Sequence, residues 1–326
     1  MFRYIIVRFV WALVIIIGIV AVNFLLTRLL PGDPISALVG EFPAPKEYVA
    51  QVRREFGLDE PLHVQLGLYL LQLAQGNLGF SFVNRQAVGP LLLQRAGVTL
   101  MLMIPSLVLA SILGMLIAVR AARSGGSTIN TFLTALSLAG VSIPVFWLAQ
   151  VLIMVFSVQL GWLPAQGMIS IRTVATGFSW FKDYLSHLVL PAFCITLSYL
   201  AVVVRVARSS MLEMLHQDFV LTARAKGLDE RTVLWRHVLR NALIPVITVI
   251  GYNFGYSLTG AILTETVFAW PGLGGLFVSS VQYQDYPVLS GIFLLAAIAV
   301  VLANLTTDIL YAVVDPRVRR ATLAPA

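Results

Sequence analysis

Charged side chains are scarce in this chain of 326 residues, where they make up 11% of the sequence while 59% is hydrophobic. A soluble domain carries roughly 25% charged residues, because its core needs a polar shell. The few charges are also bunched between long uncharged runs, and a membrane-spanning helix needs about 20 consecutive apolar residues. The scarcity excludes an ordinary soluble domain and indicates a polytopic membrane protein.

Cysteine is almost absent. The single cysteine, Cys194, lies inside an apolar run, which excludes an intrachain disulfide framework and favours a packing role. The formal net charge of +7 raises the question of nucleic acid. No aromatic residues are interleaved with the basic ones as an RNA surface requires, and membrane proteins gather basic residues on their cytoplasmic side. We therefore expect no nucleic-acid partner.

Catalytic motifs are missing as well. The sequence contains no GxxxxGK[ST] phosphate loop, no HExxH and no GxSxG, and its four histidines lack the spacing of metal ligands. The only carboxylate near the interior of an apolar run is Asp308, at the edge of the last one, so an ion-driven transporter lacks its relay residues. These absences argue against an enzyme, a metal site or a cofactor. Energy must enter through a partner.

Six uncharged runs are long enough to cross a bilayer. The first is longer than the ~7–15 apolar residues of a signal peptide and no small-residue cleavage site follows, so it is predicted to remain as a helix. The third lies in a stretch, 124–171, that could hold one helix or two. The six runs are Phe9–Thr27, Ala96–Val119, Ile129–Leu160, Tyr184–Val204, Ala242–Thr264 and Tyr286–Thr307.

The positions of the basic residues decide the topology. With six helices and a cytoplasmic N-terminus, most of them fall on the inside, as the positive-inside rule requires. Splitting the third run would place the most basic loop, 205–241, outside, so a single helix is predicted there and both termini are cytoplasmic. That loop holds seven cations: Arg205, Arg208, Arg224, Lys226, Arg231, Arg236 and Arg240.

The predicted organisation has four parts. Residues 1–30 form a tail and the first helix, 31–95 a small and partly helical extracytoplasmic region, 96–313 a core of five helices with the loop 205–241, and 314–326 a cytoplasmic tail. Apolar spacing predicts two short helices within 31–95. Small residues at Ala110, Gly114 and Ala118, and at Gly251, Gly255 and Thr259, predict close helix packing, and Pro105, Pro144, Pro191 and Pro245 predict interrupted helices.

The segment Met211–Pro245 is the long charged stretch between two apolar runs. Met211, Leu215, Phe219 and Ala223 recur every four residues and predict a helix with one apolar stripe. Gly227 can end it in a left-handed conformation, and Asp229 can cap a second short helix with Arg240 near its end. The predicted exposed face carries Asp218, Thr222, Arg224 and Lys226. Such a surface suits docking on a protein, and a solvated loop is the alternative.

Two motifs in this segment, TARAKGL at 222–228 and HVLRNA at 237–242, resemble the cytoplasmic EAA-type loop of dipeptide/oligopeptide permeases of bacterial ABC importers. The general EAA pattern has glutamate where this chain has Leu221 and proline where it has Arg240, and both departures fit the peptide-type subfamily. Further similar motifs span the chain: LPGDP at 30–34, GLDEP at 57–61, GNLGFS at 76–81, SSMLE at 209–213, ETVFAWPGLG at 265–274, DYP at 285–287 and DPR at 315–317.

The resemblance implies an all-α permease of the type I ABC importer fold in the bacterial inner membrane. It implies four partners besides the lipid bilayer: a second homologous permease, two ATPase subunits that bind ATP and magnesium, and an extracytoplasmic solute-binding protein. A coupling helix at Asp218–Lys226, hinged at Gly227, would sit in a groove of one ATPase. The coupling residues are then Asp218, Phe219, Thr222, Ala223, Arg224, Lys226 and Gly227.

The substrate is less well defined by the sequence. The resemblance implies a di- or oligopeptide, and relatives that carry glutathione, nickel chelates or oligosaccharides leave those open. Asn253, Ser257 and Thr259 have a spacing compatible with a face that lines the path, although hydrogen bonding between helices explains them equally well. A channel or an intramembrane enzyme is the remote alternative.

Overall fold

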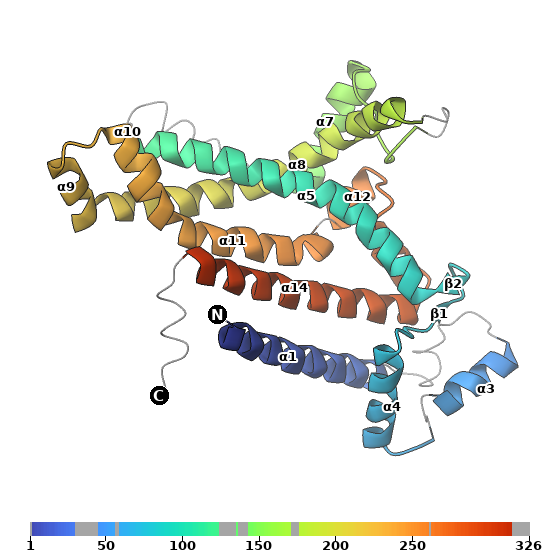
Figure 1. The fold of residues 1–326 in the computed structure, drawn as a ribbon. Helices are drawn as coiled ribbons and strands as arrows, with labels where there is room; N and C mark the ends of the chain where they lie inside the picture. Colours follow the sequence, from blue (N-terminus) through green and yellow to red (C-terminus); the bar gives the residue numbers. More distant parts are fainter. Residues whose placement is uncertain are drawn as a thin grey trace.

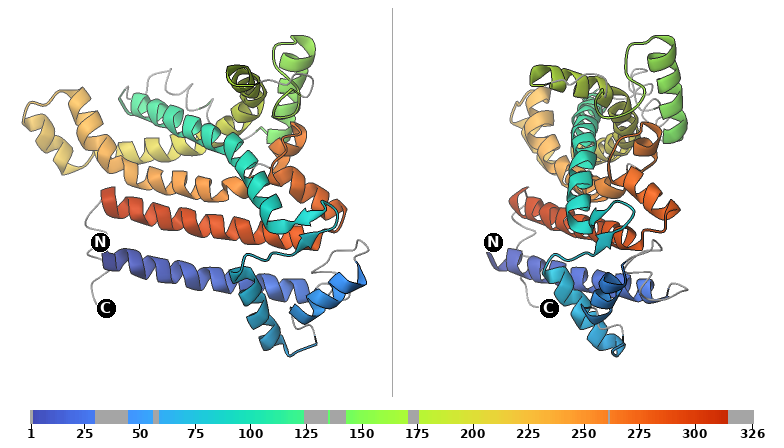
Figure 2. Two further views of the ribbon diagram at one scale, coloured as in Figure 1. Left: turned by 45° about the vertical axis from the view of Figure 1, so that its right-hand side comes forward. Right: turned by 90° about the vertical axis from the view of Figure 1, so that its right-hand side faces the viewer.

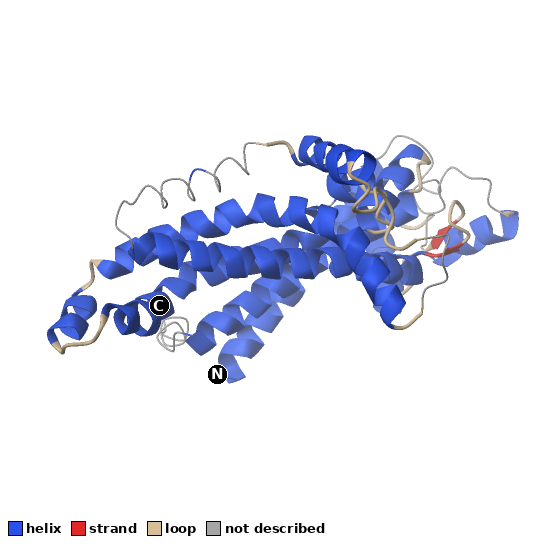
Figure 3. Ribbon diagram, turned by 90° about the horizontal axis from the view of Figure 1, so that it is seen from above, coloured by secondary structure: helices blue, strands red, loops and turns tan. Residues whose placement is uncertain are grey.

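The computed structural model describes residues 2–29, 45–55, 59–123, 135, 143–170, 176–260 and 262–314, and the side chains of these except 2–5, 26–29, 123, 256–260 and 310–314. This part of the chain is mostly helical (Figure 3). It contains five long helices, each with an apolar stretch long enough to cross a membrane. They are α1 (Phe2–Leu29), α5 (Val88–Arg123), α8 (Phe178–Leu215), α11 (Leu239–Gly260) and α14 (Tyr286–Val314).

These five helices confirm five of the six predicted runs, and each extends beyond its uncharged segment at one end or both. The third run is different. Its first part, up to residue 142, lies outside the described residues apart from residue 135, and the backbone at Ile143 and Pro144 is not helical. The helix α7 begins at Val145 and continues from Ile153 as the π-helix η1 to Gln159. One continuous helix from Ile129 to Leu160 is therefore wrong, because Pro144 lacks an N–H and its ring disfavours a helical residue before it.

The long helices lie side by side, and the molecule has two ends that we name by what they carry (Figures 1 and 2). The α9 end carries the short helix α9 (Asp218–Ala225), and the hairpin end carries the strands β1 (Phe80–Ser81) and β2 (Gln86–Ala87). Both α5 and α8 run from the hairpin end toward the α9 end. α5 therefore ends at the α9 end and α8 begins at the opposite end, which agrees with the single crossing predicted between them.

Small residues bring the long helices together, as predicted. α5 packs along α8, α11 contacts both, and α14 lies between α11 and α1 (Figure 1). A side-chain carbon added at Gly114 of α5 would overlap Val203 of α8, and one added at Gly251 of α11 would overlap Thr307 of α14. These glycines permit a backbone approach that any larger residue would prevent.

The prolines fall into two groups. Pro105, Pro191 and Pro245 lie inside α5, α8 and α11, where each removes one backbone hydrogen bond. Pro144 instead occupies the position before the first residue of α7. The interruption predicted from proline is thus a helix start at Pro144 and a local defect at the other three sites.

Several short elements lie at the hairpin end. The two helices expected within 31–95 are confirmed as α3 (Lys46–Glu55) and α4 (Leu62–Ala74), although α5 already begins at Val88, inside that region. The strands form a two-stranded antiparallel hairpin that pairs Phe80 with Ala87. Beyond α11, α12 (Ile262–Val267) packs against α7 and α8, and α13 (Leu273–Gln282) packs against α5 and α14 before the last long helix begins.

Candidate functional site

The α9 end is built around one short helix between two turns. α8 ends at Leu215, His216 and Gln217 form a turn, and α9 begins at Asp218. A continuous helix through Leu215 and Phe219 is therefore wrong. The left-handed Gly227 (φ 78°) confirms the predicted end of the helix. Asp229 caps the next helix as predicted, since its carboxylate accepts a hydrogen bond of 3.2 Å from the N–H of Thr232.

The second helix is not short. α10 (Glu230–Thr232) passes into the π-helix η2 (Val233–Val238) and then without a break into α11. Arg240 consequently lies within a helix and not near its end, which corrects the prediction. No glycine or proline occurs between Thr232 and Pro245, so nothing in the sequence stops the helix there. The segment after α9 is a continuous helical extension of a membrane helix.

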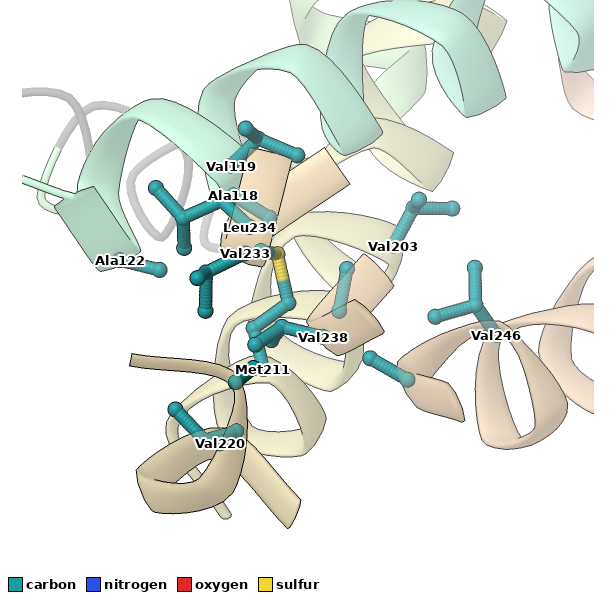
Figure 4. Packing of buried hydrophobic residues seen from close by; sticks show 13 residues of the cluster. Ala118, Val119, Ala122, Val203, Met211, Val220, Val233, Leu234, Val238 and Val246 are labelled. Carbon is teal, nitrogen blue, oxygen red and sulfur yellow. The ribbon is translucent and has the colours of Figure 1, made fainter. Parts of the chain in front are cut away.

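A buried apolar cluster fixes α9 to three long helices (Figure 4). Val220 and Ala223 are the two buried residues of α9, and Val220 is fully buried. The cluster joins α5, α8, α9, η2 and α11 in one core, and Ser210 of α8 adds a hydrogen bond of 3.1 Å to the carbonyl of Ala242. Its members are Ala118, Val119, Ala122, Val203, Ala207, Met211, Val220, Ala223, Val233, Leu234, Val238, Ala242 and Val246.

The predicted coupling residues divide between the two faces of α9. Ala223 is buried and Phe219 is half-buried against the cluster, so these two hold the helix in place. Asp218, Thr222 and Lys226 are exposed, and Gly227 is exposed in the following turn. Arg224 is exposed and forms a two-pronged ion pair with Glu230, at 2.7 and 3.2 Å, which spans the turn after α9. The pairing raises the pKa of the Arg224 guanidinium.

Sequence analysis missed three apolar residues on the exposed side of this end. Leu221 is 60% exposed, Trp235 is 47% exposed and Leu228 is 38% exposed. Large apolar side chains on a surface that also carries charges are typical of a contact with another protein. The signal was present at Leu221, which stands where the general EAA pattern has a glutamate. The position of Trp235 on the surface cannot be predicted from a short separate helix, because the residue lies in a long helix that continues into α11.

The candidate path residues are only partly described. Asn253 of α11 is buried, with 8% of its surface exposed, while the side chains of Ser257 and Thr259 lie outside the described ones. Gly251 and Gly255 face Thr307 and Ala303 of α14. The face of α11 that carries the glycines is thus a helix contact. Whether Asn253, Ser257 and Thr259 line the path stays a prediction.

Two buried carboxylates organise the hairpin end, and sequence analysis noted them only as parts of motifs. Glu265 accepts hydrogen bonds from the Thr99 hydroxyl (2.7 Å) and the Gly274 N–H (2.6 Å), and Thr99 in turn accepts one from the N–H of Leu273. Asp285 accepts one from Ser81 of the hairpin (2.5 Å). Burial raises the pKa of both carboxyls, and these hydrogen bonds offset part of the shift.

Two family models match the chain. Residues 110–320 match the binding-protein-dependent transport system inner membrane component, and residues 1–103 match the N-terminal region of the membrane component of such systems. The chain belongs to this family. The predicted resemblance is therefore confirmed, and the protein is a membrane component of a binding-protein-dependent transport system.

Relatives of this inner membrane component match it over nearly its whole length. It is 42% identical to the di/tripeptide transport system permease protein DppB of Pseudomonas aeruginosa, over 93% of this chain and 94% of that protein. It is 40% identical to the oligopeptide transport system permease protein AppB of Bacillus subtilis, over 98% and 99%. It is 38% identical to the glutathione transport system permease protein GsiC of Salmonella paratyphi A, again over 98% and 99%.

A solved structure confirms the predicted fold. The inner membrane component resembles a chain of the methionine ABC transporter MetNI in an inward-facing conformation, with a TM-score of 0.54 and 18% identity. The similarity covers 69% of this chain and 96% of the MetNI chain. At that identity the likeness concerns the fold alone. It shows that the long helices follow the arrangement of an ABC importer permease.

Proposed function

We propose that this inner membrane component is the permease subunit of an ATP-driven importer of di- and oligopeptides. It forms half of the translocation path, and a second homologous permease forms the other half. The proposal of a peptide substrate is supported by the relatives named for di/tripeptide and oligopeptide transport, which are 42% and 40% identical to this chain. Peptides reach the path from an extracytoplasmic solute-binding protein.

Energy enters at α9. The observation that carries this assignment is the anchoring of α9 by Val220 and Ala223 in a core shared with α5, α8 and α11. A force applied to α9 therefore acts on three long helices together. Cytoplasmic ATPase subunits bind the ATP and magnesium, and this chain supplies no cofactor. One ATPase accepts the exposed side of α9, where Leu221 and the charged Asp218 and Lys226 face outward.

The transport mechanism requires that the ATPases contact the permease differently in its two arrangements. ATP-driven closure of the ATPases favours one arrangement of the helix bundle over the other, because the coupling helix is held differently in the two states. The close contacts through Gly114 and Gly251 make the bundle a set of packed helices that shift as bodies and do not deform continuously. The path then alternates between facing the cytoplasm and facing outward, with Asn253, Ser257 and Thr259 as candidate lining residues.

The orientation follows from the same assignment. If α9 meets an ATPase, then the α9 end is cytoplasmic and the hairpin end faces the solute-binding protein. The first turn of α1 and the last turn of α14 both lie at the α9 end (Figure 1), which supports cytoplasmic N- and C-termini. The basic residues Arg205, Arg208 and Arg231 belong to the same end, in agreement with the positive-inside rule.

The experiment is uptake of a radiolabelled dipeptide into proteoliposomes that contain the complete transporter. Accumulation is expected to require ATP and the solute-binding protein. Gly227→Val forces a β-branched residue into a left-handed conformation (φ 78°) beside α9 and should abolish uptake. Gly161→Val imposes similar strain (φ 64°) far from α9, with open space around it, and serves as the matched control. Normal uptake by Gly227→Val would refute the coupling role.

Glutathione is the second candidate substrate, because one relative named for glutathione transport is 38% identical over 98% of this chain. Glutathione is itself a tripeptide with an unusual linkage, so the two candidates differ little in size. Competition distinguishes them. Unlabelled glutathione should leave dipeptide uptake unchanged if the system carries ordinary peptides, and it should abolish that uptake if glutathione is the substrate.

A further inference from the structure

A pocket at the hairpin end is not accounted for by the proposed path. It is formed by α3, α4, the strand β1 and the first turns of α14, and its volume is about 260 Å³. Its described lining includes the aromatic rings of Tyr48, Tyr69 and Phe80, the carboxylate of Glu55, and Ser290 of α14. These elements lie together at one end of the molecule (Figure 1).

Ring contacts and a hydrogen bond join the walls of this pocket to one another and to the neighbouring helices. The Tyr48 ring lies 6.2 Å from the Phe80 ring, centroid to centroid, and the Tyr69 ring lies 5.6 Å from Phe24 of α1. The hydrogen bond between Ser81 and the buried Asp285 fixes the hairpin to the start of α14. The pocket is therefore formed before any partner arrives, which lowers the entropic cost of binding.

The chemistry of the lining favours a cation. Of the described residues that line the pocket, Glu55 alone carries a charge, and the amide of Gln51 donates a hydrogen bond of 2.7 Å to its carboxylate. Burial and the nearby Glu55 charge raise the pKa of Tyr48, so the tyrosine keeps its hydroxyl proton. Aromatic faces beside a carboxylate bind a guanidinium or an ammonium group through cation–π and charge-assisted contacts.

The size and position of the pocket favour a side chain of a partner over a free peptide. Pockets that enclose small-molecule ligands are usually about 300–1,000 Å³. At about 260 Å³ this one is smaller, and it has room for one long side chain. Two of the helices that line it, α3 and α4, lie on the α1 side of α14, whereas α8 and α11 lie on the other side (Figures 1 and 2).

We propose that this pocket receives an arginine or lysine side chain of the extracytoplasmic solute-binding protein when that protein docks on the permease. Glu55 pairs with the cationic group, and the rings of Tyr48, Tyr69 and Phe80 cover its stem. The proposal rests on the proposed function, because it requires a solute-binding protein. It adds a defined anchor point on the surface that this partner meets.

The test measures the affinity of the purified solute-binding protein for the complete transporter in lipid nanodiscs. Glu55→Gln keeps the shape of the side chain and removes its charge, and the dissociation constant should rise about tenfold. Ser290→Phe fills the pocket from α14 while the Glu55 carboxylate is kept, and it should have a similar effect. Glu60→Gln is the matched control, because Glu60 is exposed nearby but does not line the pocket. Its affinity should equal that of the unmodified transporter.

The outcomes separate this proposal from the proposed function. Affinities within about twofold of the unmodified transporter for both Glu55→Gln and Ser290→Phe would overturn the anchor, and so would an equal loss in Glu60→Gln. A rise in the KM for lysine-containing dipeptides with unchanged affinity for the binding protein would assign the pocket to free peptide and also overturn it. If the unmodified transporter took up peptide without any binding protein, the proposed function itself would fail.

Discussion

The anchoring of α9 can be tested through Val220, which is fully buried in the cluster that joins α9 to α5, α8 and α11. Val220→Ala removes two methyl groups and leaves a small cavity, which should cost about 2 kcal/mol. Of the eight residues of α9, only Val220 and Ala223 are buried, so the helix has little else to hold it. The loss should appear as local detachment of α9 and not as global unfolding.

The assay is hydrogen exchange of the α9 amides in the purified transporter. A loss of about 2 kcal/mol should speed their exchange about 30-fold. Leu221→Ala is the matched control, since Leu221 is the next residue and is 60% exposed. Measured with the ATPase subunits removed, it should leave α9 exchange unchanged. In the complete transporter it should weaken the association with the ATPase, because an exposed leucine gains its burial from the partner. Unchanged α9 exchange in Val220→Ala would refute the reasoning about the anchor.

Three further predictions concern packing and titration away from α9. Gly251→Ala should lower the melting temperature, because the added carbon pushes α11 away from Thr307. The double variant Gly251→Ala/Thr307→Ala should regain much of the lost melting temperature. If the losses of the two single variants simply add in the double variant, the two residues are not in direct contact. Gly272→Ala should reduce the yield of folded protein, because the added carbon overlaps Glu265, whereas Gly18→Ala in open space should not. Burial raises the pKa of Glu265 in the folded state, so the melting temperature should rise as the pH is lowered toward the ordinary pKa of a glutamate, about 4.3. The rise should be smaller in Glu265→Gln.

The membrane helices could be predicted because lipid imposes a simple requirement. Each spanning helix needs about 20 apolar residues with its backbone bonded internally, and such runs are visible without any tertiary information. The local sequence signals that bound α9 could be predicted equally well. A glycine that ends a helix and an aspartate that caps the next one act within a few residues, as Gly227 and Asp229 do.

Other features depended on residues far apart in the sequence. Glu265 could not be assigned to a buried site from its motif, because its partner Thr99 lies 166 positions away. The pocket at Glu55 likewise depends on α14, which begins only at Tyr286. The helix through Val233 and Val238 was mistaken for a short one, since a charged segment between two apolar runs looked like a loop. Its apolar residues belong to a core that only the packing of α5, α8 and α11 creates.

The most direct test of the central claim is a cross-link between α9 and an ATPase subunit. The native Cys194 is buried, so a single engineered cysteine is the accessible one. With Leu221→Cys in the assembled transporter, a short thiol-reactive cross-linker should join the permease to the ATPase. Leu62→Cys is also exposed but lies at the hairpin end, and it should give no cross-linked product with the ATPase. Absence of the product at position 221 in a transporter that still takes up peptide would contradict the claim that α9 is where ATP-driven force enters the permease.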